Sequence, residues 1–143
     1  MNHIPTQSHQ IRFPDSSKIA QLKKTKSCTT LFFDSSFYDE NKLMTMLPDF
    51  IECITLQGTS NMCFDQEVEL DMTNLPRNLL YLKIGYKYKY LLTLDYLPAG
   101  LKVLLLGDKV DAPIDNLPQG VEILEIGKQF SHSIDNLPDS IKI

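Results

Sequence analysis

Apolar positions in this chain recur in a pattern much longer than the period of a helix or a strand. The segments that begin at Leu75, Leu97 and Leu117 read LPRNLLYLKIG, LPAGLKVLLLG and LPQGVEILEIG. Each has Leu-Pro, two variable residues, an apolar residue, two more variable residues and then Leu-x-Leu/Ile-Gly. A self-similar period of this size is the signature of a repeat protein.

Inside each repeat the apolar residues alternate as they do in a short, half-buried strand. Over residues 122–126 the alternation predicts that Leu124 and Ile126 point inward and that Ile123 and Glu125 point outward. The equivalent strand centres in the chain are Leu31, Ile54, Leu82, Leu104 and Leu124.

The residues around this strand also have expected roles. We expect Gly127 to adopt a positive φ where the chain leaves the strand. Phe130 and Ile134 should fill the core from the returning side of the unit. Asp135-Asn136-Leu137-Pro138 is typical of a turn that starts the next unit.

Asp and Asn recur at this turn, at Asp115-Asn116 and Asp135-Asn136 and, in single matching places, at Asn74 and Asp95. Carboxylates in such numbers could suggest catalytic pairs or calcium ligands. Because these residues recur at the same position of each repeat, a role in the turns or in a ladder between repeats is favoured instead.

Because one short unit cannot bury its own apolar face, neighbouring units must stack, strand beside strand. The sequence therefore predicts a β-rich solenoid, leucine-rich-repeat-like, of about five stacked units with a parallel sheet on one side. It covers residues 28–143, degenerate over 28–69 and regular over 70–143, with a truncated last repeat. Residues 1–27 are polar and basic, and we expect them to be poorly ordered.

The motifs PIDNLP at 113–118 and SIDNLP at 133–138 each follow a predicted strand that ends in Gly. With these motifs the chain resembles the FNIP repeat family, whose leucine-rich-repeat-like members are best known from amoebae and their giant DNA viruses. The name motif, Phe-Asn-x-Pro-Ile, is present only in halves, as Pro113-Ile114 and as Phe130 with Ile134. In some members an F-box precedes the repeats, which implies substrate recognition for a ubiquitin-ligase-type complex; residues 1–27 lack the apolar pattern of an F-box.

Charge is divided unevenly along the chain of 143 residues, whose formal net charge is −4. Residues 1–30 carry five basic side chains and one acidic, a net +4, and the remainder carries nine basic and seventeen acidic, a net −8. An acidic body disfavours general phosphate binding. No apolar run reaches the roughly 20 residues of a membrane span, and no signal peptide is evident, so we expect an intracellular, cytoplasmic protein (host cytoplasm if viral).

The outward positions of the predicted strands form two columns that are candidates for partner binding. The first column is apolar and consists of Cys53, Tyr81, Val103 and Ile123. The second column mixes polar, apolar and charged residues, and its candidates are Lys83, Leu105 and Glu125. Solenoids commonly bind through this face. Ordinary β-propensity, or coverage by the N-terminal segment, would explain the same apolar column without a partner.

Tyr86-Lys87-Tyr88-Lys89-Tyr90 is the most unusual local run. Alternating aromatic and basic side chains could stack on and neutralise single-stranded nucleic acid, and Tyr86, Tyr88 and Tyr90 are also candidates for protein contact. A structural role is favoured, because one tyrosine should replace an inward residue such as Val110.

These features favour a non-enzymatic protein-interaction module with no cofactor and no metal. Cys28, Cys53 and Cys63 fit neither a disulfide framework nor a zinc pattern. The alternative function is nucleic-acid contact through the Tyr/Lys run and the basic tail. The last strand should be an open edge, so self-association through it is also expected.

Overall fold

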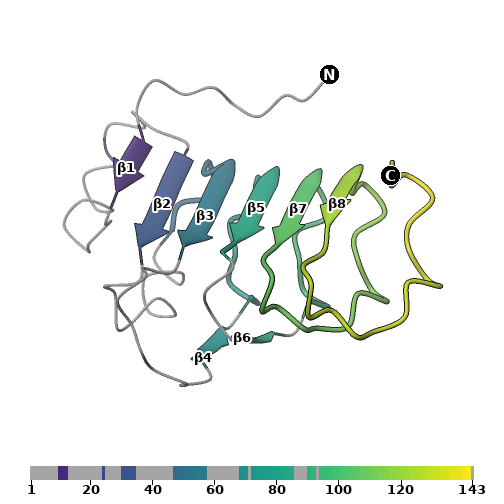
Figure 1. Ribbon diagram of the computed structural model, residues 1–143. Helices are drawn as coiled ribbons and strands as arrows, with labels where there is room; N and C mark the ends of the chain where they lie inside the picture. Colours follow the sequence, from purple (N-terminus) through teal and green to yellow (C-terminus); the bar gives the residue numbers. More distant parts are fainter. Residues whose placement is uncertain are drawn as a thin grey trace.

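Among the residues that the structure describes, the main sheet has six strands, all parallel, in the order β1-β2-β3-β5-β7-β8 (Figure 1). The computed structural model describes residues 10–12, 24, 30–34, 47–57, 68–70, 72–85, 90–92 and 94–142. The strands of this sheet are β1 (Gln10–Arg12), β2 (Thr30–Asp34), β3 (Cys53–Gln57), β5 (Tyr81–Ile84), β7 (Val103–Leu106) and β8 (Ile123–Glu125). Every element whose bounds are described is a strand.

The strands pair in the register that the repeat alignment predicts. Leu31 pairs with Ile54, which pairs with Leu82, and the column continues through Leu104 to Leu124. The first four of these side chains are 0% exposed. The predicted parallel, repeat-like sheet with an inward apolar column is therefore confirmed.

Strands β3, β5, β7 and β8 each begin after a turn that a Leu-Pro pair opens. The carbonyl oxygen of the proline accepts a hydrogen bond from the N–H of the apolar residue three places later, as from Pro98 to Leu101 and from Pro118 to Val121, both at 3.1 Å. This bond closes a four-residue turn around the two variable positions. The turn delivers Leu101 and Val121, each 0% exposed, into the core directly before the strand.

Backbone hydrogen bonds between units repeat as regularly as the turns. The carbonyl oxygen of Leu80 accepts hydrogen bonds from the N–H groups of Lys102 and Val103, at 2.9 and 3.0 Å. One unit later the carbonyl oxygen of Lys102 accepts from Glu122 and Ile123, at 2.9 and 3.1 Å. Each unit is thus fixed to the next by the same contact.

A second, two-stranded sheet pairs β4 (Val68–Leu70) with β6 (Tyr90–Leu92) in parallel. It lies away from the main sheet, below it in Figure 1. Its strands lie on the returning side of their units, since Val68 and Tyr90 each come seven residues before a Leu-Pro pair, at the position of Val110 and Phe130. The repeat alignment expects apolar core residues at this position and does not predict a second sheet there. The sheet also extends beyond the expected start of the repeats at residue 28, because β1 comes from the N-terminal segment.

The last unit is less buried than the alternation predicts. Ile126, which the alternation predicts to point inward, is 39% exposed, and Ile134 is 53% exposed, so the expectation that Ile134 fills the core is wrong. Their equivalents one unit earlier, Leu106 and Ile114, are only 2% and 1% exposed. The difference has a simple cause, since in this fold the neighbouring unit covers the inner side chains. The last strand is also shorter than predicted, Ile123–Glu125 rather than 122–126.

Gly127 has a different role from the one expected. Its φ lies outside the left-handed region, so a positive φ is not the reason for glycine here. A Cβ at this position would instead collide with the carbonyl oxygen of Gly107 and with the Cα of Asp108. Glycine therefore permits two successive units to approach closely, backbone against backbone.

Candidate functional site

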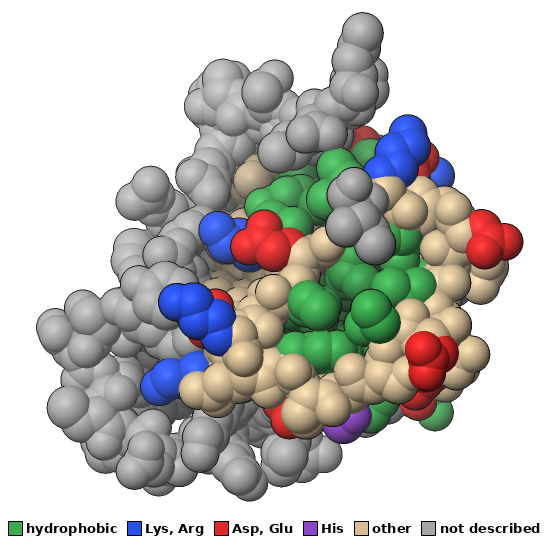
Figure 2. Space-filling view, turned by 45° about the vertical axis from the view of Figure 1, so that its right-hand side comes forward, with side chains coloured by type: hydrophobic (Ala, Val, Ile, Leu, Met, Phe, Trp, Pro, Cys, Tyr) green, Lys and Arg blue, Asp and Glu red, His purple; other side chains and the backbone are tan. Residues whose placement is uncertain are grey.

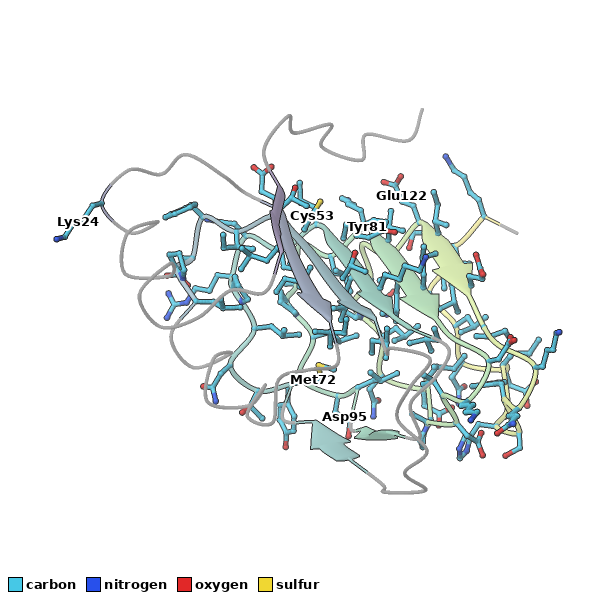
Figure 3. The ribbon with its side chains drawn as sticks, turned by 60° about the vertical axis from the view of Figure 1, so that its left-hand side comes forward. Lys24, Cys53, Met72, Tyr81, Asp95 and Glu122 are labelled. Carbon is cyan, nitrogen blue, oxygen red and sulfur yellow. The ribbon has the colours of Figure 1, made fainter. Side chains whose placement is uncertain are left out.

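The two outward columns form one continuous face on β3, β5, β7 and β8. Cys53 pairs in register with Tyr81, Tyr81 with Val103, and Val103 with Ile123. The second column runs through Thr55, Lys83, Leu105 and Glu125. In Figure 3 the labelled Cys53 and Tyr81 lie on neighbouring strands at the same end of the sheet. The alignment of these columns is as the sequence predicts.

Exposure divides the columns. Cys53 is only 2% exposed, so it offers almost no surface to a partner. Tyr81, Val103 and Ile123 are half-buried, as is Leu105, while Lys83 and Glu125 are exposed. The accessible part of the face is therefore the stretch over β5, β7 and β8. We call it the β5–β8 face, made of Tyr81, Lys83, Val103, Leu105, Ile123 and Glu125.

The phenol of Tyr81 is the polar group at the centre of this arrangement. Burial raises the pKa of Tyr81 above its usual value of 10.0, and Coulombic interactions with Cys53 and Glu125 add to the rise. The hydroxyl therefore stays protonated throughout the physiological range. It can donate a hydrogen bond from an otherwise apolar surface, the property that makes tyrosine common at protein interfaces.

An ion pair borders the face where β7 and β8 begin. The Nζ of Lys102 lies 3.5 Å from the Oε1 of Glu122, and both side chains are about half exposed. An exposed pair of this kind contributes little to stability, at most about 1 kcal/mol. It gives the face a charged boundary next to the half-buried Val103 and Ile123.

The Asp and Asn side chains of the turns form a ladder between units, as their spacing predicts. The Nδ2 of Asn116 donates to the Oδ1 of Asp95 at 3.0 Å, and the Nδ2 of Asn136 donates to the Oδ1 of Asp115 at 3.2 Å. Each asparagine thus binds the aspartate of the preceding unit. These carboxylates are occupied in holding units together, which explains their recurrence without catalysis.

Ser131, His132 and Asp111 form the most triad-like cluster of the described residues, but their geometry is not that of a nucleophile. The Oγ of Ser131 lies 2.9 Å from the Oδ2 of Asp111, and the Nε2 of His132 lies 3.4 Å from Oδ1 of the same carboxylate. The aspartate is therefore central, and serine donates to it directly. A nucleophilic serine needs the imidazole to accept its proton. The cluster instead links one unit to the next.

The Tyr/Lys run lies largely outside the described residues. Tyr86 to Lys89 are not described, and Tyr90 is the first residue of β6. The proposals for nucleic-acid or protein contact through this run therefore stay predictions.

The described residues also bear on metal sites and membrane spans. Among these residues, no group of three or more His, Cys, Asp or Glu side chains is arranged to hold a metal ion. Within the same residues, no helix is long and apolar enough to cross a membrane.

Three large apolar side chains of the described residues are exposed. Tyr96 is 63% exposed, and Ile126 and Ile134 lie at the end of the sheet that carries β8. Tyr96 occupies the slot that Asn116 and Asn136 occupy in later units, so the aromatic residue breaks the polar ladder there. That break in the repeat was the available signal for Tyr96.

Comparisons of the chain with protein-family models, with curated proteins and with solved structures found no match.

Proposed function

We propose that the chain is a leucine-rich-repeat-like solenoid of the FNIP type and acts as a non-enzymatic protein-interaction module. The proposed contact surface is the β5–β8 face. The repeat spacing, the common strand register and the Asp/Asn ladder support the solenoid. The resemblance of PIDNLP and SIDNLP supports the repeat type.

The observation that carries the proposal is the make-up of the β5–β8 face. Three half-buried side chains, Tyr81, Val103 and Ile123, lie side by side on successive strands. Exposed charges of opposite sign, Lys83 and Glu125, stand in the neighbouring column. Protein interfaces have this organisation, an apolar centre with a polar rim and often a tyrosine near the centre.

The test is capture of protein partners by the immobilised chain, with and without nuclease. We expect Val103→Glu with Ile123→Glu to lose the partners that the unaltered chain retains, because two carboxylates would be placed in the apolar centre. Ala99→Glu with Gln119→Glu is the matched control, since it adds the same charges at exposed turn positions of the same two repeats. The control should retain the partners.

Circular dichroism and thermal melting show whether the first variant is folded. Lys83→Glu supplies a second variant, since its position is exposed and the change does not threaten the core. We expect it to weaken capture as well. If the folded variants and the control capture the same partners equally, the contact surface is elsewhere. If nuclease removes every partner, the alternative of nucleic-acid contact is favoured.

A further inference from the structure

We propose that the partner of the β5–β8 face is the same face of a second copy of the chain, so that two copies form a symmetric dimer. The inference rests on the proposed function, because it names the occupant of the same surface. The contact lies on the outward face of the sheet. It differs from self-association through the edge of β8, where Lys142 of the same chain already bonds to Glu122.

The second column of the face carries a positive charge, an apolar side chain and a negative charge, in that order. Lys83 on β5 pairs in register with Leu105 on β7, which pairs with Glu125 on β8. Both charged side chains are exposed, and among the described residues neither has an ion-pair partner within 4 Å. Two strand spacings of about 4.8 Å separate the charged positions, roughly 10 Å in all. Figure 2 shows basic and acidic side chains beside apolar ones on the visible surface.

This order of charges is complementary to itself under a twofold rotation about an axis parallel to β7. The rotation turns one sheet to face the other and exchanges β5 with β8, while β7 lies opposite β7 of the second copy. Lys83 of each copy then lies opposite Glu125 of the other, and Leu105 lies opposite Leu105. Most homodimers use the same patch on both copies in this way. One contact therefore joins opposite charges twice.

The apolar column fits the same rotation. Val103 lies opposite Val103, and Tyr81 of each copy lies opposite Ile123 of the other. All three side chains are half-buried within one chain, so a second copy would remove further apolar surface from water. Sheets that pack face to face keep their strands within about 30° of one another and fill the space between them with such side chains.

A second rotation also brings two copies of the face together, about an axis that runs across the strands. It places β5 opposite β5 and β8 opposite β8, so Lys83 approaches Lys83 and Glu125 approaches Glu125. Like charges disfavour this arrangement. Lys102 and Glu122 do not alter the choice, because they already form an ion pair within one chain. The charges therefore select the axis parallel to β7.

The first test is sedimentation equilibrium of the 143-residue chain. The face is small, so we expect weak association, with a Kd of about 100 μM. The average mass should rise with concentration toward that of two chains and no further, because a twofold interface closes on itself. High salt should weaken the dimer, since it screens exposed charges.

Charge reversal then locates the contact. Lys83→Glu and Glu125→Lys should each weaken the dimer about tenfold, because each change turns two attractions into two repulsions. An equimolar mixture of the two variants should form heterodimers about as strong as the unaltered dimer, because both contacts then join opposite charges. Arg77→Glu is the matched control, since it makes the same change of charge at an exposed turn position of the repeat that contains Lys83. The control should dimerise like the unaltered chain.

Circular dichroism of every variant controls for folding, and the mixture restores the contact between copies without a doubly altered chain. A chain that stays monomeric to about 1 mM would overturn the inference. So would a mixture that associates no more strongly than its two components. A mass that continues beyond two chains would also overturn it and would assign the contact to a sheet edge.

Failure of this inference is distinguishable from failure of the proposed function. A monomeric chain whose folded Val103→Glu, Ile123→Glu variant loses other captured proteins would overturn the dimer alone. A dimer with the expected charge dependence, and with no other protein captured through the face, would confirm that the second copy is the partner.

Discussion

A single hydrogen atom is all that Gly127 can present to the preceding unit, whose backbone at Gly107 and Asp108 occupies the place of a Cβ. We expect Gly127→Ala to lower the free energy of unfolding by about 1–3 kcal/mol, the usual cost of overpacking. The neighbour is backbone and cannot swing aside as a flexible side chain can. Thermal or urea unfolding measures the change.

Gly100 is the control for Gly127. A Cβ there would meet nothing within 4 Å, and its φ is also outside the left-handed region. Gly100→Ala should therefore leave stability unchanged or raise it by up to about 1 kcal/mol, through the reduced freedom of the unfolded chain. Equal losses for the two variants would mean that glycine flexibility, and not close approach, is what both positions require.

Asp111 makes the stability of the last units depend on acid pH. Hydrogen bonds from the backbone N–H and the hydroxyl of Ser131, together with the charge of His132, hold the pKa of Asp111 below its usual 3.8. The ionised form is favoured in the folded state, so its contribution is present above the unfolded pKa and is lost as the pH falls through the lower, folded value.

We therefore expect the melting temperature to fall with acidification below about pH 4, and to fall less steeply in Asp111→Asn. Melting curves from pH 6 downward measure both slopes. Because the amide cannot ionise, an equally steep decline in the variant would show that other carboxylates account for the acid sensitivity.

Along the turns, the ladder acts between units and not within one. Asn136 binds Asp115 of the preceding unit, and Asn116 binds Asp95. A double-mutant cycle of Asp115→Ala and Asn136→Ala should yield a coupling energy of about 0.5–1 kcal/mol, the net value of an exposed hydrogen bond. Urea unfolding of the four proteins measures it.

Asp95 and Asn136 provide the matched non-contacting pair, since they belong to different rungs of the ladder. The effects of Asp95→Ala and Asn136→Ala should simply add. Coupling of equal size in both cycles would indicate that the alanines act through the backbone of the turns, and that the side-chain bonds contribute nothing specific.

The period of the chain was sufficient to predict the register of five strands, because equivalent slots must align once the units stack. The inner column through Leu104 and the outer column through Val103 both follow from it. The period did not predict β1, which precedes the first recognised repeat, or the pairing of β4 with β6, which lie on the returning side of two units. Pairing with a distant segment, and not local preference, makes them strands.

Burial within the candidate site was harder to predict than register. Alternation assigns a side chain to one face, but whether that face is covered depends on other parts of the chain. Cys53 lies in the outward column and is nevertheless only 2% exposed, while Ile126 lies in an inner column and is 39% exposed. Gly127 likewise depends on another part of the chain, because the backbone of the preceding unit leaves no room there for a Cβ.

At the scale of the whole molecule, the core is a row of similar layers that differ in how deeply their side chains are buried. Leu82 and Leu104 occupy one inner column and are each 0% exposed, with a paired strand on both sides. Leu124 continues the column but is only half-buried, because β8 is the edge of the sheet. In a stack of units, stability is approximately a sum of nearest-neighbour contacts, so equivalent leucines should not contribute equally.

One substitution made at three equivalent positions tests this. Leu82→Ala and Leu104→Ala should each cost about 2–5 kcal/mol, the range for a buried leucine that leaves a cavity. Leu124→Ala should cost less than half as much, because part of the side chain is already in water. Urea unfolding at a concentration where the chain is monomeric keeps association between copies out of the comparison. Equal losses at all three positions would mean that the layer around Leu124 is as fully closed as the interior ones, and that the edge at β8 is covered in solution.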